Sequence, residues 1–172
     1  MSADVLTDDD RQRIIAGPDA SGWTPLEAAL VRAVDELHHH SGISAGIRTL
    51  DGDEKEICRK SGIRYFTMRE IDERGMHTVM KEAIAVASNG TAAIHLSLDM
   101  DGIDPLYAPG VSTPVTGGLS YREAHLALEM LADTGLLRSM EFVELNPMTD
   151  LVHKTAMLTV ELIQSALGKS IV

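Results

Sequence analysis

Two aspartates, Asp99 and Asp101, directly follow an apolar run over residues 92–98. In a β-strand, side chains two residues apart project to the same face, so both carboxylates are expected to point off the C-terminal end of this strand. Two adjacent carboxylates are costly unless a cation lies between them, and hard divalent ions such as manganese or magnesium prefer oxygen ligands. The pair therefore predicts a metal site. The alternative is a solvated acidic turn ended by Gly102 and Pro105.

Two other metal-dependent interpretations fit the sequence less well. An EF-hand loop starting at Asp99 would place Ile103, Asp104 and Gly110 at its fifth, sixth and twelfth positions, where it needs an acidic residue, a glycine and an acidic residue. A haloacid-dehalogenase-type phosphatase also begins with an apolar strand and Asp-x-Asp-Gly, and its first Asp is phosphorylated beside magnesium. That family has Thr where Ile103 stands and a later acidic metal pair, which this sequence lacks. The phosphatase stays as a less favoured alternative.

A longer pattern surrounds the aspartate pair. It consists of SLDMDGIDP at residues 97–105, APGVSTPVTGGLSYRE at 108–123, EFVELNP at 141–147 and GIRTLD at 46–51. In this order and at this length, these segments closely resemble the C-terminal portion of the ureohydrolase family in its arginase version, over residues 45–172. The resemblance implies a partial arginase fold for those residues.

The resemblance also implies roles for five residues. Arginases bind two manganese ions, and Asp99 and Asp101 match ligands of that cluster. The ions lower the pKa of a bridging water, and the resulting hydroxide attacks the guanidinium carbon of L-arginine to give ornithine and urea. Glu144 matches the carboxylate that holds the guanidinium group through parallel hydrogen bonds. Asp51 matches the contact to the substrate α-amino group, and Thr113 matches a hydroxyl near the reacting centre.

Part of the family's metal site is not found in residues 1–44. The Gly-Gly-Asp-His and Asp-Ala-His-x-Asp segments of the family, and a histidine that serves as proton shuttle, do not occur there. The manganese cluster is therefore expected to be incomplete, and this chain alone is expected to hydrolyse L-arginine poorly. Arginases form trimers or hexamers, so a homo-oligomer is expected. The alternative function is a noncatalytic remnant that acts as an oligomerisation or binding module.

Residues 1–44 are expected to form a helical segment that is not of arginase type. Thr24 and Glu27 can form a capping box with Pro25 at the first helical position. The helix would end at the histidines 38–40, which spread around a helix surface and cannot all face one metal. This segment weakly resembles the opening helices of carboxymuconolactone-decarboxylase-like proteins.

From residue 45 onward, short apolar runs alternate with helical patterns. Such alternation predicts an α/β fold, a three-layer α/β/α arrangement with a mostly parallel sheet, with ligands at the carboxyl ends of its strands. Asp99, Asp101 and Glu144 are therefore expected to converge at one end. His95 lies about 13 Å back along its strand and is expected to be a hydrogen-bonded core residue. The expected strands are 45–47, 63–66, 92–98 and 141–145, and the expected helices include 53–60, 76–88 and 154–167, with capping boxes at Thr67–Glu70 and Ser120–Glu123.

Composition limits the partners. Fifteen Lys and Arg against 26 Asp and Glu give a net charge of −11, which disfavours nucleic acid and anionic lipid surfaces. The single cysteine, Cys58, excludes an internal disulfide. No signal-peptide pattern or apolar run of about 20 residues is present, so a cytoplasmic protein with a small-molecule guanidino substrate is expected.

Overall fold

The computed structural model describes residues 43–50, 52–61 and 63–169. These ranges fall within one compact unit that starts at Ile43. Within them, no helix is long and apolar enough to cross a membrane. The helix predicted over residues 24–40, with its three histidines, lies outside the described residues.

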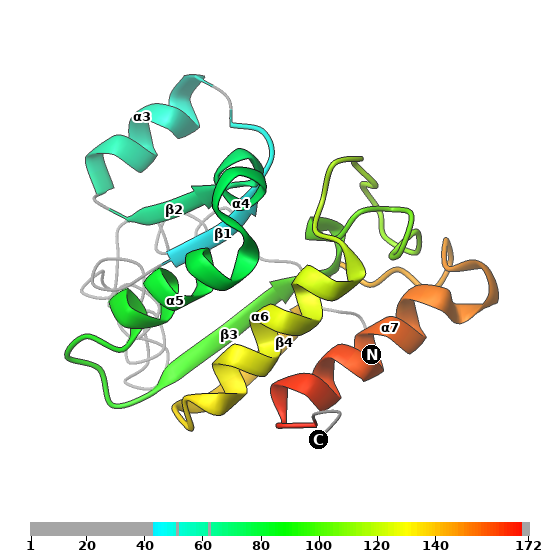
Figure 1. The fold of residues 1–172 in the computed structure, drawn as a ribbon. Helices are drawn as coiled ribbons and strands as arrows, with labels where there is room; N and C mark the ends of the chain where they lie inside the picture. The colour runs from blue at the N-terminus through cyan, green and yellow to red at the C-terminus, as the bar shows by residue number, and fades with distance from the viewer. Residues whose placement is uncertain (1–42, 51, 62, 170–172) are drawn as a thin grey trace, which may run out of the picture. The chain divides into compact units, whose positions relative to one another are not determined.

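The described strands form two parallel pairs (Figure 1). In the first, β1 (Ile43–Ile47) pairs with β2 (Arg64–Thr67), and in the second, β3 (Ile94–Asp99) pairs with β4 (Leu137–Val143). The predicted α/β class with parallel strands is therefore confirmed, although these residues form two separate pairs where one sheet was expected. The helices are α3 (Gly52–Ser61), α4 (Met68–Arg74), α5 (Met76–Ala87), α6 (Tyr121–Asp133) and α7 (Lys154–Ala166), with 3-10 turns η1 (Met100–Gly102) and η2 (Leu151–His153).

Two helices begin at the capping boxes that the sequence predicts. Thr67 accepts a hydrogen bond from the Glu70 amide at 3.2 Å, and the Glu70 carboxylate accepts one from the Thr67 amide at 3.2 Å. Ser120 and Glu123 make the same reciprocal contacts at 3.3 and 2.8 Å. Each box satisfies amide groups that have no partner within the helix, so these starts are fixed by local sequence.

The last strand differs from its prediction. It was expected over residues 141–145, but β4 runs from Leu137 to Val143. The strand ends early because Glu144 has a φ of 62°, which lies outside the extended region. Glu144 is therefore not part of the strand pairing and lies directly after the carboxyl end of β4.

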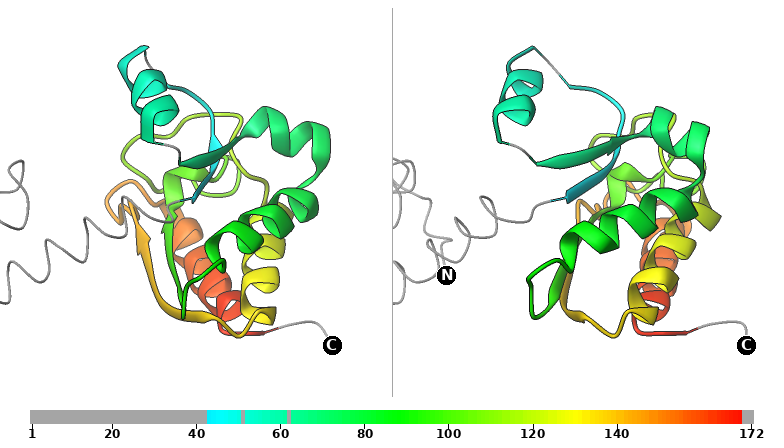
Figure 2. Two further views of the ribbon diagram at one scale, coloured as in Figure 1. Left: turned by 90° about the vertical axis from the view of Figure 1, so that its left-hand side faces the viewer. Right: turned by 60° about the vertical axis from the view of Figure 1, so that its left-hand side comes forward.

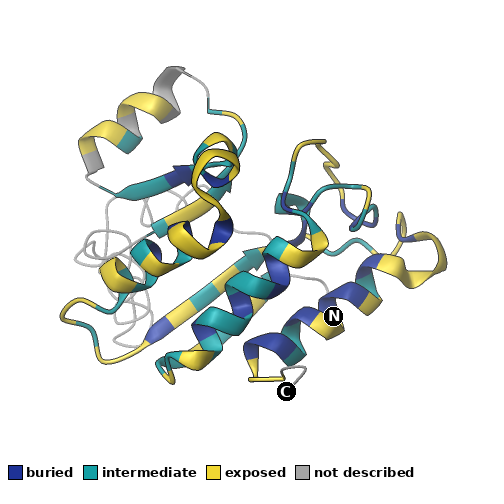
Figure 3. Ribbon diagram, viewed as in Figure 1, coloured by how far each residue is buried: buried dark blue, intermediate teal, exposed yellow. Residues whose placement is uncertain are grey.

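Helices α6 and α7 cover one face of the β3–β4 pair (Figures 1 and 2), and the core of this pair lies on that face. Leu96 and Leu98 of β3 pack against buried side chains of α6 and α7, including Leu128 and Leu162. These helices bury the faces that point toward the strands and expose the opposite faces (Figure 3). Burial of such side chains stabilises the fold by about 2 kcal/mol each.

The expectation that His95 of β3 lies in the core is wrong. His95 is exposed, not part of the core, because its position in the strand points away from Leu96 and its helices. The predicted hydrogen bond is present: His95 Nδ1 lies 2.8 Å from Ser139 Oγ on β4.

A second core links the two strand pairs. Phe66 of β2 and Val79 of α5 are fully buried, and they belong to a cluster that includes Leu119, which precedes α6. Leu126 of α6 packs against the same cluster. One packed cluster therefore joins the β1–β2 pair to α5 and to the start of α6.

A buried histidine lies between α6 and α7. His125 is 6% exposed, and its Nδ1 lies 2.9 Å from Ser165 Oγ. Its Nε2 has no hydrogen-bond partner among the described residues. Burial is the main cause that lowers the pKa of His125 below its ordinary value, and the positive charge of Arg122 acts in the same direction.

This histidine makes stability depend on pH. Because the pKa of His125 is lower in the folded state, the unfolded chain binds a proton first, near its pKa of about 6.5. The stabilising effect is complete above that value and is lost as the pH falls below it. We expect the unfolding free energy to drop between about pH 7.5 and 5.5, and to drop less in His125→Gln. Denaturant titrations at both pH values measure this, and equal losses in the two proteins would contradict it.

Candidate active site

Three carboxylates lie at the carboxyl ends of β3 and β4. Asp99 is the last residue of β3 and pairs in register with Val143 of β4, which Glu144 follows directly. Asp101 lies on η1, where its amide donates a hydrogen bond to Asp99 Oδ1 at 2.9 Å. The structure thus brings Asp99, Asp101 and Glu144 to one end of the strand pair, as the strand ends predict.

The electrostatics around Asp101 favour a cation. Its pKa is raised above the ordinary aspartate value, first by burial and then by the negative charge of Asp99, with a smaller contribution from Glu144. The positive charge of Arg48 acts in the opposite direction. A half-buried carboxylate among like charges is stabilised by a bound cation, which suits a site for a metal or a guanidinium group.

Glu144 is held in an unusual backbone conformation. A non-glycine residue at a φ of 62° is uncommon and costs free energy, and such residues concentrate at functional sites. The residues on its C-terminal side hold it in place: Leu145 forms a bridge with Val111, and the Asn146 amide donates to the Gly110 carbonyl at 2.9 Å. The Glu144 side chain is exposed and therefore accessible to a ligand.

The Pro- and Gly-rich loop over residues 103–119 borders these carboxylates. Asp104 shapes it by accepting hydrogen bonds from the amides of Leu106 at 2.9 Å and Gly117 at 2.7 Å, which lower the pKa of Asp104. Thr113 is exposed in this loop. Its neighbour Ser112 accepts a hydrogen bond from the Asn146 side chain at 3.1 Å. This contact holds the Thr113 segment beside the chain that follows Glu144.

Asp150 lies against Gly110 of this loop and was not among the site residues predicted from the sequence. This buried carboxylate accepts hydrogen bonds from the amides of Thr155 at 2.9 Å and Ala156 at 2.8 Å, at the start of α7. Burial raises its pKa, but these hydrogen bonds outweigh burial and the net pKa is lowered. Thr155 Oγ1 in turn accepts from the Gly110 amide at 2.7 Å. The only local signal is an acidic residue shortly before a helix.

The sequence reasoning also did not assign a role to Arg48, although it lies within one of the segments that carried the resemblance. Its guanidinium group donates hydrogen bonds to the backbone carbonyls of Asp101, at 2.6 Å, and Val115. It also lies 3.6 Å from the Asp101 carboxylate. Arg48 therefore joins the end of β1 to the carboxylate turn and to the 103–119 loop.

The donor chemistry of Asp99 and Asp101 fits a hard divalent ion such as manganese. In residues 43–50, 52–61 and 63–169, however, no group of three or more His, Cys, Asp or Glu side chains could hold a metal. These two carboxylates therefore fit one part of a metal site and do not complete it. Asp51, the residue matched to the substrate α-amino group, lies outside the described residues.

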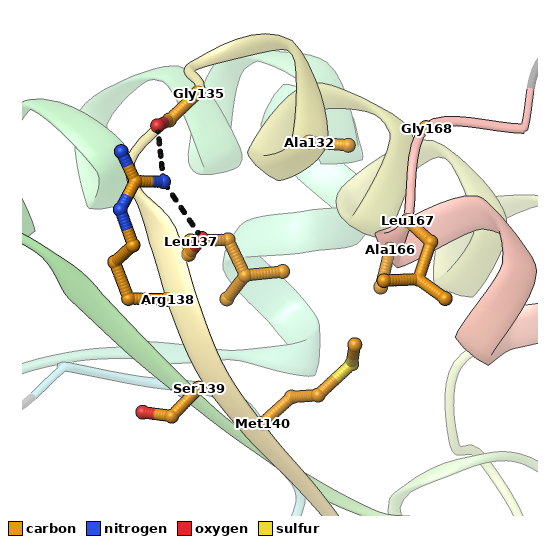
Figure 4. A pocket seen from close by; sticks show the side chains of 9 residues that line it. All are labelled: Ala132, Gly135, Leu137, Arg138, Ser139, Met140, Ala166, Leu167 and Gly168. Atoms are coloured by element: carbon orange, nitrogen blue, oxygen red, sulfur yellow. Dashed lines mark hydrogen bonds between the residues drawn. The ribbon is translucent and has the colours of Figure 1, made fainter.

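A cavity of about 400 Å³ lies elsewhere, between the ends of α6 and α7 and the start of β4 (Figure 4). It is lined by residues such as Leu137, Met140 and Ala166. Leu137 opens β4, whereas the three carboxylates gather where β4 ends, so the cavity is separate from the candidate site.

Comparison with known proteins assigns the family. The model of the Arginase family matches residues 18–168, and so extends upstream of the boundary predicted at residue 45. Arginase of Bacillus caldovelox is 52% identical over 126 residues, which are 73% of this chain and 42% of that protein. Arginase of Brucella melitensis is 41% identical over 151 residues, which are 88% of this chain and 49% of that protein. The chain thus spans less than half the length of these relatives.

Solved structures agree with the sequence matches. The native structure of Bacillus caldovelox arginase superposes with a TM-score of 0.75 at 48% identity, and covers 78% of this chain and 45% of that one. This similarity confirms the arginase-type fold expected for the described part. The chain belongs to the arginase family.

Proposed function

We propose that this protein contributes to manganese-dependent hydrolysis of the guanidinium group of L-arginine, which yields ornithine and urea. The observation that supports this most strongly is the convergence of Asp99, Asp101 and Glu144 at the ends of two parallel strands in a member of the arginase family. Manganese would supply a hydroxide nucleophile at neutral pH.

Each described residue of the site has a separate task in this proposal. Asp99 and Asp101 would contribute oxygen ligands to the metal. Glu144 would bind the guanidinium group, because a carboxylate and a forked cation form parallel, charge-assisted hydrogen bonds. Thr113 would place a hydroxyl beside the reacting carbon, and Asp51 would bind the α-amino group.

Urea release from L-arginine with excess manganese tests the function. The rate is expected to be low but above that of a metal-free control, because the described residues provide few metal ligands. Agmatine, which keeps the guanidinium group but lacks the carboxylate, tests whether the substrate is L-arginine itself. No urea from either compound, together with no binding of manganese, would overturn the proposal.

Glu144→Gln is expected to weaken use of L-arginine. The substitution keeps the size of the side chain but removes the negative charge, and a hydrogen bond between charged groups contributes about 1.5–3 kcal/mol. We expect kcat/KM to fall about 10- to 100-fold. Calorimetric binding of L-arginine gives a second readout that does not require turnover.

Glu141→Gln is the matched control for this substitution. Glu141 is also an exposed carboxylate on the same stretch of chain, but it lies in β4 beside His95, on the exposed face of the strand pair. Its replacement should leave kcat/KM unchanged. Equal losses in the two variants would show that Glu144 acts only through the general charge of the region.

A further inference from the structure

One arginine contacts three separate parts of the candidate site. Arg48 lies just after β1, and its guanidinium group donates to the carbonyl of Asp101 in the carboxylate turn and to the carbonyl of Val115 in the 103–119 loop. These partners are 53 and 67 residues away in the sequence. The same group lies 3.6 Å from the Asp101 carboxylate, and the Arg48 side chain is only 15% exposed.

The contacts depend on the shape of a guanidinium group. Arginine has five donors in a fixed planar fork, so one side chain can donate in several directions at once while it keeps its charge. Lysine carries the same charge on a single nitrogen and cannot reproduce this arrangement. The two carbonyls that Arg48 binds are on segments without regular strand pairing, which therefore depend on such contacts for their position.

We propose that Arg48 is a positioning residue that holds the Asp99–Asp101 turn and the 112–118 segment in the geometry needed to bind metal and substrate. The relevance to catalysis rests on the function proposed above. The contacts of Arg48 are present in the described structure whether or not that function holds.

Whether the loss of Arg48 weakens or strengthens manganese binding distinguishes a positioning role from a purely electrostatic one. If Arg48 acted only through its charge, its removal would strengthen manganese binding, because a cation beside Asp101 repels a second cation. If Arg48 positions the turn, its removal weakens manganese binding. Arg48→Lys retains the charge and loses the fork, whereas Arg48→Met loses both and retains an apolar stem.

Amide hydrogen exchange on the metal-free protein tests the positioning directly. The amides of Asp101, Asp104, Gly117 and Leu119 are all hydrogen-bonded within residues 99–119, the stretch that contains both segments. In both Arg48 variants they should exchange about tenfold faster or more, whereas amides within α5 should keep their rates. Unchanged exchange at these amides in either variant would overturn the inference.

Arg138→Met provides a matched control. Arg138 also donates to two backbone carbonyls, those of Gly135 and Leu137, but it lies at the start of β4 beside the separate cavity (Figure 4). Its replacement removes the same type of contact and should leave exchange in the two site segments unchanged. Faster exchange there in Arg138→Met would indicate general loosening of the fold, and would overturn a specific role for Arg48.

Calorimetric titration with Mn²⁺ alone tests whether the contacts of Arg48 affect metal binding. Both Arg48 variants should bind Mn²⁺ about 10- to 100-fold more weakly than the unsubstituted chain, as is usual when a residue that orients metal ligands is lost. Tighter binding in Arg48→Met would overturn the inference in favour of a charge effect. If the unsubstituted chain binds no Mn²⁺ and releases no urea, the proposed function fails, and the exchange rates still decide whether Arg48 positions the two segments.

Discussion

Replacement of Gly110 by alanine is expected to lower the unfolding free energy by about 3 kcal/mol or more. A Cβ at this position would lie 2.4 Å from the Cβ and 2.5 Å from the Cγ of Asp150, closer than such atoms can approach. Asp150 cannot simply move aside, because it is buried and its carboxylate caps the start of α7 through Thr155 and Ala156. Loss of a helix cap costs about 1 kcal/mol in addition to the steric strain.

The same substitution should also disturb the candidate site. The Gly110 carbonyl accepts the Asn146 amide, so Gly110 fixes the chain immediately after Glu144. Chemical denaturation measures the stability change, and calorimetry with L-arginine measures the effect on binding. Gly102→Ala is the control, because a Cβ there meets nothing within 4 Å and should change stability by less than about 0.5 kcal/mol. A Gly110→Ala protein as stable as this control would contradict the expected clash.

Local features of the fold could be predicted because their causes lie within a few residues. The capping boxes at Thr67 and Ser120 depend on side chains three positions apart, and both form. The start of the last helix at Lys154 was also predicted. The convergence of Asp99 and Glu144 followed from the general rule that parallel strands place their carboxyl ends together.

Features that depend on distant contacts could not be predicted in this way. The end of β4 is set by the positive φ of Glu144, which is stabilised by the bridge between Leu145 and Val111. His95 was expected in the core because it lies too far back along its strand to join a metal site, but the helices cover only the opposite face of that strand. Nothing adjacent in the sequence indicates that Arg48 reaches Val115, or that Asp150 fills the space beside Gly110.

Asp101→Ala is expected to show how much of the metal site this chain provides. Asp101 is a half-buried carboxylate next to Asp99, so its removal takes away one of two adjacent negative charges that attract a cation. We expect Mn²⁺ affinity to fall about 100-fold or more, since the interaction of a carboxylate with a contacting cation amounts to several kcal/mol near a protein surface. Calorimetric titration of both proteins measures this loss. Equal affinity would place any bound manganese elsewhere.

Asp99→Ala is the companion variant, because it removes the other carboxylate and the acceptor of the Asp101 amide. If both aspartates bind the same ion, each substitution should weaken Mn²⁺ binding, and the double variant should bind no metal at the site. Additive, small losses would instead indicate that the two carboxylates only increase the local negative charge.

The rate of urea release from L-arginine tests whether this metal site supports turnover. A two-metal mechanism would need enough ligands to hold both ions, which together would supply a nucleophile at neutral pH. The described residues supply Asp99 and Asp101 and no group of three metal-binding side chains, so metal would be held weakly. With excess manganese, we therefore expect turnover at least about 100-fold slower than that of Bacillus caldovelox arginase measured in parallel, and none in Asp101→Ala. A rate close to that of the relative, abolished by the substitution, would mean that residues outside the described ranges complete the cluster, because Asp99 and Asp101 alone cannot hold two ions.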